Sequence, residues 1–408
     1  MNLNMNQMCD HHAKNPGMNR QPATRPRIVL PAHSSVLIGI IIFCMTACIA
    51  NAQPSGKKLP GSDETNDAIV RSLAYLEKGG TGWLESQGCA GCHHAPMMIW
   101  SLNEAHSRGF KVNQKAIETV QTHAFDEYLK SPTLKPHPQD TGGENGLSYN
   151  IIALTLASES SGVQPDGREG KTKQALDKFL THLIATQNSD GSWKKSSRTP
   201  PLIDSDEIVT LWSAFALDFA CKDRPAGDPV VQSRNRAFTW AAAHQTGEET
   251  QALAVRLLLA VRTHAAETIN TRTQTLLAKQ RPDGGWSQTA ERSSDCIATG
   301  MALYALSQAG ITSANPSIPR AWSFLLKTQQ PDGSWQVHTR GSGMHDSVIS
   351  YYGSGWATLG LLYTQPVLPP AQYVPACIMF TYRYLSPKIL DHLYIPVLEQ
   401  IQTSRFYP

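Results

Sequence analysis

The 408-residue chain is 41% hydrophobic and 17% charged, which gives enough apolar material for one large core or two ordinary ones. Its 36 Lys and Arg residues exceed its 33 Asp and Glu residues by three, and this whole surplus lies in the first 52 residues. The rest of the chain is electrically balanced and lacks a basic footprint for phosphate backbones. The composition therefore argues against nucleic-acid binding, and also against a collagen-like or wholly disordered chain.

The first 52 residues have the pattern of a signal peptide or membrane leader. A basic stretch at 20–27 precedes an apolar run at 36–50, which ends in the small-x-small sequence Ala50-Asn51-Ala52. We expect the mature chain to start near Gln53, with a linker over 53–63. A lipoprotein-like site at Cys48 and an uncleaved anchor remain as alternatives. In each case the body is exported, and it is periplasmic or anchored on the periplasmic side. Membrane association is expected only if the leader is retained or lipidated.

Internal repeats organise the body of the chain. Three segments share one pattern: TQNSDGSW ends at Trp193, KQRPDGGW at Trp286 and TQQPDGSW at Trp335, and a shorter copy, GGTGW, ends at Trp83. The intervals of 110, 93 and 49 residues between these tryptophans are close to two, two and one units. A fixed period of about 50 residues indicates a repeat architecture.

Each unit combines an amphipathic helix, an Asp-Gly turn and a second, more apolar helix. Asp and Gly supply the cap and the positive φ that such a turn needs. Six second helices are expected, beginning near Cys92, Leu147, Asp206, Glu249, Asp295 and Asp346. Six antiparallel helix pairs over 64–364 predict an all-α fold, a closed (α/α)6 toroid with the second helices inside. An open superhelix is the alternative.

The Gln-x-x-Asp-Gly-x-Trp pattern resembles the QW repeat of squalene–hopene cyclases and the related repeat of prenyltransferases. The resemblance covers about residues 64–364 and implies the toroid fold and a hydrophobic or isoprenoid-like small molecule as ligand. It implies less about activity, because one fold hosts many functions. The stretch 365–408, rich in Pro and Tyr, fits no repeat, and we interpret it as a tail or strap.

A second motif lies in the first unit, where GCAGCHH contains Cys89-Ala-Gly-Cys92-His93. This is the C-x-x-C-H pattern of covalent c-type haem attachment. Two thiols one helical turn apart reach the two vinyl groups, and the next residue presents an imidazole to the iron. We therefore predict haem c, attached through Cys89 and Cys92, with His93 as the metal ligand. Export is consistent with this, since c-type haem is attached outside the cytoplasm in bacteria.

Other roles remain open for this motif. Cys89, Cys92 and a histidine, with one distant ligand, would hold zinc. The two thiols alone would form a structural or redox-active disulfide. If haem is bound, the sixth iron ligand is undetermined, and the candidates include Met97, Met98 and His345.

Asp204-Ser205-Asp206-Glu207 opens the third second helix and resembles the D-x-D-D motif of squalene–hopene cyclases. In that family the acid at the third position protonates a terminal alkene, and here this acid would be Asp206. It must be buried, protonated and hydrogen-bonded by neighbouring carboxyls, here Asp204 and Glu207. The sequence departs from the motif at Glu207, and its length suits one helical barrel where those cyclases use two.

Three functions follow from these observations. The first is electron transfer or redox chemistry by a covalent haem at the toroid mouth, acting on a hydrophobic ligand and with a redox partner; an enzyme of this kind would be a haem-dependent oxidoreductase. The second is a class II terpene-cyclase-like enzyme with Asp206 as general acid. The third is a non-catalytic binding or scaffold toroid.

Four aromatic residues of the second helices are expected to line a funnel or, more simply, to pack in the core: Trp100, Trp212, Tyr304 and Trp356.

Overall fold

The computed structural model describes residues that all belong to one compact unit of the chain: 62–87, 93–130, 143–160, 168–195, 205–338 and 346–365. Within these ranges every regular element is a helix. The predicted leader, nearly all of the linker and the predicted tail beyond Gln365 lie outside the described residues.

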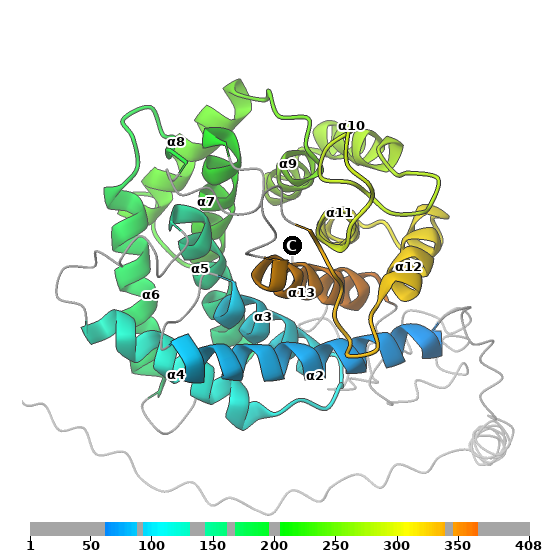
Figure 1. Ribbon diagram of the computed structural model, residues 1–408. Coiled ribbons are helices and arrows are strands. Elements are labelled where there is room, and N and C mark those ends of the chain that lie inside the picture. Colours follow the sequence, from blue (N-terminus) through cyan, green and yellow to red (C-terminus); the bar gives the residue numbers. More distant parts are fainter. Residues whose placement is uncertain are drawn as a thin grey trace, which may run out of the picture. The chain divides into compact units, whose positions relative to one another are not determined.

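The helices form two concentric rings built from six hairpins (Figure 1). The first helix of each hairpin lies outside: α2 (Ser62–Gln87), α4 (Gln114–Lys130), α6 (Arg168–Ala185), α8 (Pro229–Ala243), α10 (Ala266–Ala278) and α12 (Ser317–Thr328). The second helix lies inside: α3 (His94–Ser107), α5 (Gly143–Ser160), α7 (Asp206–Ala220), α9 (Thr250–Arg262), α11 (Cys296–Gln308) and α13 (Asp346–Thr364). Each inner helix contacts the next, and α13 contacts α3. The predicted (α/α)6 toroid is confirmed, and the ring is closed.

Inner helices such as α7, α11 and α13 are rich in apolar residues and buried on nearly all sides, as expected of helices that are covered by neighbours in every direction. In α11 every residue from Cys296 to Leu306 is buried. Small residues let these helices approach one another closely. Gly300 of α11 faces the backbone of α13 at Trp356, where a methyl group would lie 2.7 Å from the Ala357 nitrogen.

The tryptophan of each repeat joins the two helices of its hairpin. Trp193, Trp286 and Trp335 are almost fully buried. Each indole N–H donates at 2.8 Å to a carbonyl of the preceding outer helix, at Leu183, Leu276 and Leu325. Each backbone N–H donates to a hydroxyl of the following inner helix, on Thr210, Thr299 and Ser354. The repeated sequence thus encodes a repeated hydrogen-bond pattern.

The glutamine of each repeat joins one hairpin to the next. Gln187 donates to the carbonyl of Ser233 at 3.0 Å, and Gln280 donates to that of Ser317 at 2.8 Å. In the last repeat, Gln329 donates at 2.8 Å to the carbonyl of Ala68 in α2. The contact that links successive repeats therefore also closes the ring between its last and first hairpins.

Replacing Gln329 with Ala is expected to lower the free energy of unfolding by about 1–3 kcal/mol, because two side-chain donor bonds and an acceptor bond from Arg71 are lost together. Urea denaturation measures this loss. The neighbouring Gln330 is the matched control: its side chain donates only to the nearby carbonyl of Thr328 in an exposed position. Equal effects of Gln329→Ala and Gln330→Ala would contradict the closure role.

The shorter sequence copy at Trp83 lies within a helix and does not form a repeat turn. Helix α2 continues through GGTGW to Gln87. The segment lacks the Asp-Gly pair that ends the helix in the other repeats. Its glycines instead allow close packing, because added methyl groups at Gly79 and Gly80 would collide with the side chains of Tyr351 and Met98.

None of the helices in the described ranges is both long and apolar enough to cross a membrane.

Cys221 and Cys296, the two cysteines among these residues, are free thiols.

Candidate functional site

His93 and His94 mark the start of inner helix α3. Because each inner helix follows an antiparallel outer one, all six begin at the same rim of the toroid. The imidazole of His94 stacks between Trp83 and Tyr351, with ring centroids 4.0 and 4.1 Å away and interplanar angles of 11° and 24°. The ring of His93 instead meets the ring of Tyr352 edge-on at 5.4 Å. The two adjacent histidines therefore have different surroundings.

Both imidazoles are neutral at physiological pH. Burial lowers the pKa of His93 from 6.5 to about 4. Burial, with a smaller contribution from the neighbouring His93, lowers the pKa of His94 to about 3. The side chain of His93 makes no capping hydrogen bond at the start of α3. A neutral imidazole is the form that binds a metal ion.

Four of the predicted residues lie outside the described ranges: Cys89, Cys92, Asp204 and His345. The geometry of the Cys pair and of the first acid in the predicted acidic motif is therefore not described. Among the described residues, no group of three or more His, Cys, Asp or Glu side chains is placed to hold a metal ion.

Met97 and Met98 are fully buried in helix contacts. Met97 packs against Gly355 of α13, and Met98 packs against Gly80 of α2. Both thioethers are occupied by packing, so the structure does not favour either as a sixth iron ligand.

Aromatic side chains from five inner helices fill the centre of the toroid. The ring of Trp356 lies 5.5 Å from the rings of Trp100 and Trp212 and 5.9 Å from that of Tyr304. Tyr149 packs against Trp212 at 4.9 Å. These centroid distances are typical of direct ring packing. Of the two roles expected for the aromatic residues, the structure favours core packing over lining a funnel.

The environment of Asp206 is not that of the predicted proton donor. Its carboxylate accepts hydrogen bonds from the Lys194 ammonium at 2.7 Å and from the backbone N–H of Lys195 at 2.9 Å. The side chain is 35% exposed, and that of Lys194 is 75% exposed. The hydrogen bond from Lys194 holds the pKa of Asp206 below its usual value. A cyclase acid needs the opposite shift, so the expectation of a buried, protonated Asp206 is not met.

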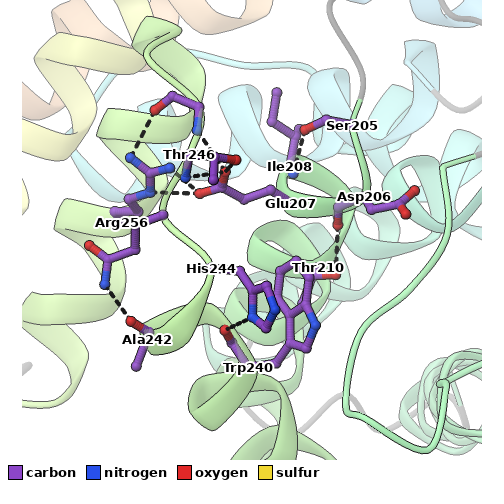
Figure 2. A network of polar contacts seen from close by, with 12 residues as sticks. Ser205, Asp206, Glu207, Ile208, Thr210, Trp240, Ala242, His244, Thr246 and Arg256 are labelled. Carbon is purple, nitrogen blue, oxygen red and sulfur yellow. Dashed lines mark hydrogen bonds and ion pairs between the residues drawn. The ribbon is translucent and has the colours of Figure 1, made fainter.

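Glu207 points away from Asp206 and into a buried ion pair (Figure 2). One carboxylate oxygen accepts from Arg256 Nε at 2.7 Å, and the other accepts from the backbone N–H groups of Thr246 and Gly247 at 3.1 and 2.8 Å. Glu207 and Arg256 are 6% and 7% exposed. Consecutive helical residues face about 100° apart. The two carboxyls therefore do not share hydrogen bonds in the way the predicted motif requires.

Titration of Asp206 checks this assignment directly. Its carboxyl is expected to titrate below the ordinary value of 3.8, and Lys194→Ala is expected to raise the pKa towards that value. Because the folded pKa is lowered, any stability that the pair contributes is present above the unfolded pKa and is lost as the pH falls through the folded pKa. Carbon-13 NMR of the side-chain carboxyl measures the midpoint. A midpoint well above 3.8 would restore Asp206 as a proton donor.

Asp295 shows the capping role that the first residues of inner helices often take. Its carboxylate accepts from the backbone N–H groups of Ile297 and Ala298 at 2.9 and 3.0 Å, as an N-cap of α11. Burial raises its pKa, and burial also raises the pKa of the adjacent thiol of Cys296. A protonated, buried thiol is inert.

Three features of this rim had no signal in the sequence. Lys194 and Arg256 are 12 and 49 residues from the acids that they pair with. The Trp83–His94–Tyr351 stack joins α2, α3 and α13. Such pairings depend on the tertiary fold, and only an explicit superposition of the repeats onto a toroid would have brought them together.

Two sequence comparisons agree with the fold. Residues 224–328, from before α8 to the end of α12, match the squalene–hopene cyclase N-terminal domain. Drimenyl diphosphate synthase from Streptomyces showdoensis is 28% identical over 191 residues, which is 47% of this chain and 27% of that enzyme. The chain thus spans about a quarter of the length of this relative. The matches confirm the resemblance that the QW-type repeats predicted.

Solved structures extend the likeness of the fold. A possible GH105-family member from Salmonella enterica has a TM-score of 0.54 at 14% identity, covering 76% of this chain and 95% of that one. A polysaccharide lyase has a TM-score of 0.50 at 13% identity, with 73% and 96% covered. At such low identity these matches concern the architecture alone.

Proposed function

We propose that this squalene–hopene cyclase-like toroid is an exported redox protein that carries a covalent c-type haem at one rim. Cys89 and Cys92 would attach the group, and His93 would bind the iron. The observation that supports this assignment is the contrast between the two histidines: burial keeps His93, next to Cys92, in the neutral form that binds iron, whereas His94 is held between two aromatic rings.

The described part of the motif fits the group. An iron ligand must be a neutral imidazole, and burial keeps His93 in that form. His93 comes directly after the second cysteine, as the C-x-x-C-H pattern requires. When bound, the haem would supply one-electron transfer, and its potential would depend on the ligands and the dielectric around it.

Other residues of the chain would orient His93, the proposed iron ligand, and keep water away from it. The stack of Trp83, His94 and Tyr351 fixes the first turn of α3 against α2 and α13. Tyr352 meets His93 edge-on, and its hydroxyl donates to that of Tyr149 at 2.6 Å inside the core. These contacts hold the start of α3 rigidly, and rigid support is what precise ligation needs.

The leader pattern supports work outside the cytoplasm, and a covalent c-type haem would require it. A redox protein would then be the partner. A hydrophobic small molecule at the rim is the second expected partner. Zinc held by the same cysteines is the competing occupant, and the test below separates the two.

The optical spectrum of the full chain tests the ligand assignment, after expression in a host that matures c-type cytochromes. We expect a Soret band whose position changes in His93→Ala, because the iron loses its imidazole. His94→Phe is the matched control: it keeps an aromatic ring in the stack and should leave the spectrum unchanged. A shifted spectrum in His94→Phe with none in His93→Ala would overturn the assignment, and bound zinc without a Soret band would overturn the haem.

A class II terpene-cyclase-like activity is the second candidate, and the match to drimenyl diphosphate synthase is the observation in its favour. The family match at 224–328 does not include Asp206, and that carboxylate is paired with Lys194. Incubating the protein with isoprenoid diphosphates or polyprenes and comparing products with those of Asp206→Asn tests it. A cyclic product lost in Asp206→Asn would support this function, and an unchanged product profile would remove it.

A further inference from the structure

A continuous column of aromatic rings runs from His93 to the opposite rim of the toroid. The ring of Tyr352 lies 5.4 Å from His93, and that of Trp356 lies 6.3 Å from Tyr352. Tyr304 follows at 5.9 Å from Trp356, and Tyr363 follows at 4.8 Å from Tyr304. Each separation is within the range of direct ring contact. No aliphatic side chain therefore interrupts the path.

One inner helix sets the direction of this column. Tyr352, Trp356 and Tyr363 are all on α13, with spacings of four and seven residues, which place them on one helix face. Tyr352 and Trp356 are completely buried, and Tyr363 is partly buried near the helix end. The column therefore starts beside the proposed haem ligand and ends near the surface at the other rim.

The hydroxyl of Tyr363, the last residue of the column, is hydrogen-bonded to a carboxylate that can accept its proton. Tyr363 donates to Oε2 of Glu104 at 2.9 Å, and Oε1 of Glu104 accepts from Arg108 Nε at 2.5 Å. The Arg108 guanidinium lies 4.8 Å above the Tyr363 ring. Burial raises the pKa of Tyr363 well above its usual value, so the phenol stays protonated. Because the Arg108 cation lies above the ring, Tyr363 loses an electron easily only if its phenolic proton leaves as well. The Glu104 carboxylate is placed to accept that proton.

We propose that Tyr363 is a redox-active tyrosine that gives its electron through the aromatic column towards His93 and its phenolic proton to Glu104. The use of this route in the cell rests on the proposed haem, where the oxidant would be a peroxide. The column would then carry oxidising equivalents from the haem rim to an electron donor, such as a phenol, at the far rim.

The step balances as follows. Tyr363 loses one electron and one proton, which leaves a neutral phenoxyl radical and a protonated Glu104. The electron moves along the column to the oxidant, and Glu104 later releases its proton to water. A peroxide takes up two electrons and two protons and forms two water molecules, so it serves two such steps. A phenol then returns a hydrogen atom to each Tyr363 radical and becomes a phenoxyl radical itself.

A measurement without haem tests the column by itself. The full chain, produced without haem and checked for helicity by circular dichroism, is irradiated with an ultraviolet laser pulse that ejects electrons from tryptophan. Hexaamminecobalt(III) removes the ejected electrons and is reduced irreversibly to Co(II). Transient absorption then follows the decay of the tryptophan radical and the growth of the tyrosine radical. We expect tyrosine radical to form within the protein as tryptophan radical disappears.

Three variants assign this signal. Tyr363→Phe should lose most of the tyrosine-radical growth, while Tyr75→Phe, which removes a phenolic hydroxyl outside the column, should keep it. Glu104→Gln keeps the hydrogen-bonded shape but removes the base, and it should slow the growth by at least about tenfold. Unchanged growth in both Tyr363→Phe and Glu104→Gln would overturn the inference.

The haem-loaded protein gives a second readout. After peroxide treatment and freezing, electron paramagnetic resonance should show a tyrosyl radical that is absent in Tyr363→Phe. If the protein binds no haem, the proposed function fails and the laser experiment still decides the role of the column. If haem is bound and Tyr363→Phe changes neither signal, the inference fails and the proposed function stands.

Discussion

Replacing Glu207 with Ala is expected to lower the free energy of unfolding by about 3–5 kcal/mol, because it leaves the Arg256 guanidinium buried without its counter-charge. The same change removes the acceptor of two backbone N–H groups, those of Thr246 and Gly247. These groups belong to the segment that connects α8 to α9 (Figure 2). Urea denaturation with a constant m-value measures the loss.

The neighbouring Glu248 is the matched control for this experiment. It makes an ion pair with Lys279, and both side chains are solvent-exposed. Glu248→Ala should leave the urea midpoint almost unchanged, since exposed pairs contribute little. A double variant, Glu207→Ala with Arg256→Met, should recover part of the lost stability because no unpaired charge remains. Equal, small effects of Glu207→Ala and Glu248→Ala would show that the buried pair is not structural.

The second large effect is expected at Gly300, where α11 and α13 touch through their backbones. An added methyl group would collide with the carbonyl group of Trp356, and Gly360 of α13 packs against the same spot. Backbone atoms in a closed ring have little room to move. Gly300→Ala should therefore cost at least about 1–3 kcal/mol through overpacking, and more if α13 cannot shift.

Gly82 provides the comparison, because it too is a glycine inside a helix. A methyl group there would meet no atom within 4 Å. Gly82→Ala should raise the free energy of unfolding by about 0.5–1 kcal/mol through its better helix propensity. Thermal unfolding of the two variants checks whether Gly300→Ala lowers the stability while Gly82→Ala raises it. A stabilising Gly300→Ala would contradict the close approach of the two helices.

Most of the architecture followed from the repeat. The motif predicted where hairpins lie, because Asp and Gly can end one helix and Trp can join it to the next, as at Trp286. The starts of the inner helices were predicted to within a few residues, for example Asp206 in α7 and Asp346 in α13. Local chemistry decides these features, so a single sequence contains them. The Trp83 copy lacks the Asp of the other repeats, and helix α2 continues through it.

The site followed from the sequence less completely. The pattern of Asp204, Asp206 and Glu207 suggested a proton donor, but the roles of two of these acids depend on distant cations. Lys194 keeps Asp206 charged at the surface, and Arg256 holds Glu207 in a buried pair. Charge partners of this kind are set by tertiary packing, which a motif of four residues does not contain.

The same limit applies to the paired histidines. The sequence named His93 as the ligand from its position after Cys92, and this remains a prediction. It gave no role to His94, which stacks on rings contributed by two other helices.

The pyridine haemochrome spectrum of the denatured, washed protein tests the central claim most directly. The full chain is expressed with its leader in a host that matures c-type cytochromes, beside the variant Cys92→Ala. We predict a haemochrome spectrum shifted by thioether attachment in the wild-type protein, and loss of that two-bond form in the variant. Absence of haem after denaturation, with zinc or no metal found by elemental analysis, would contradict the account.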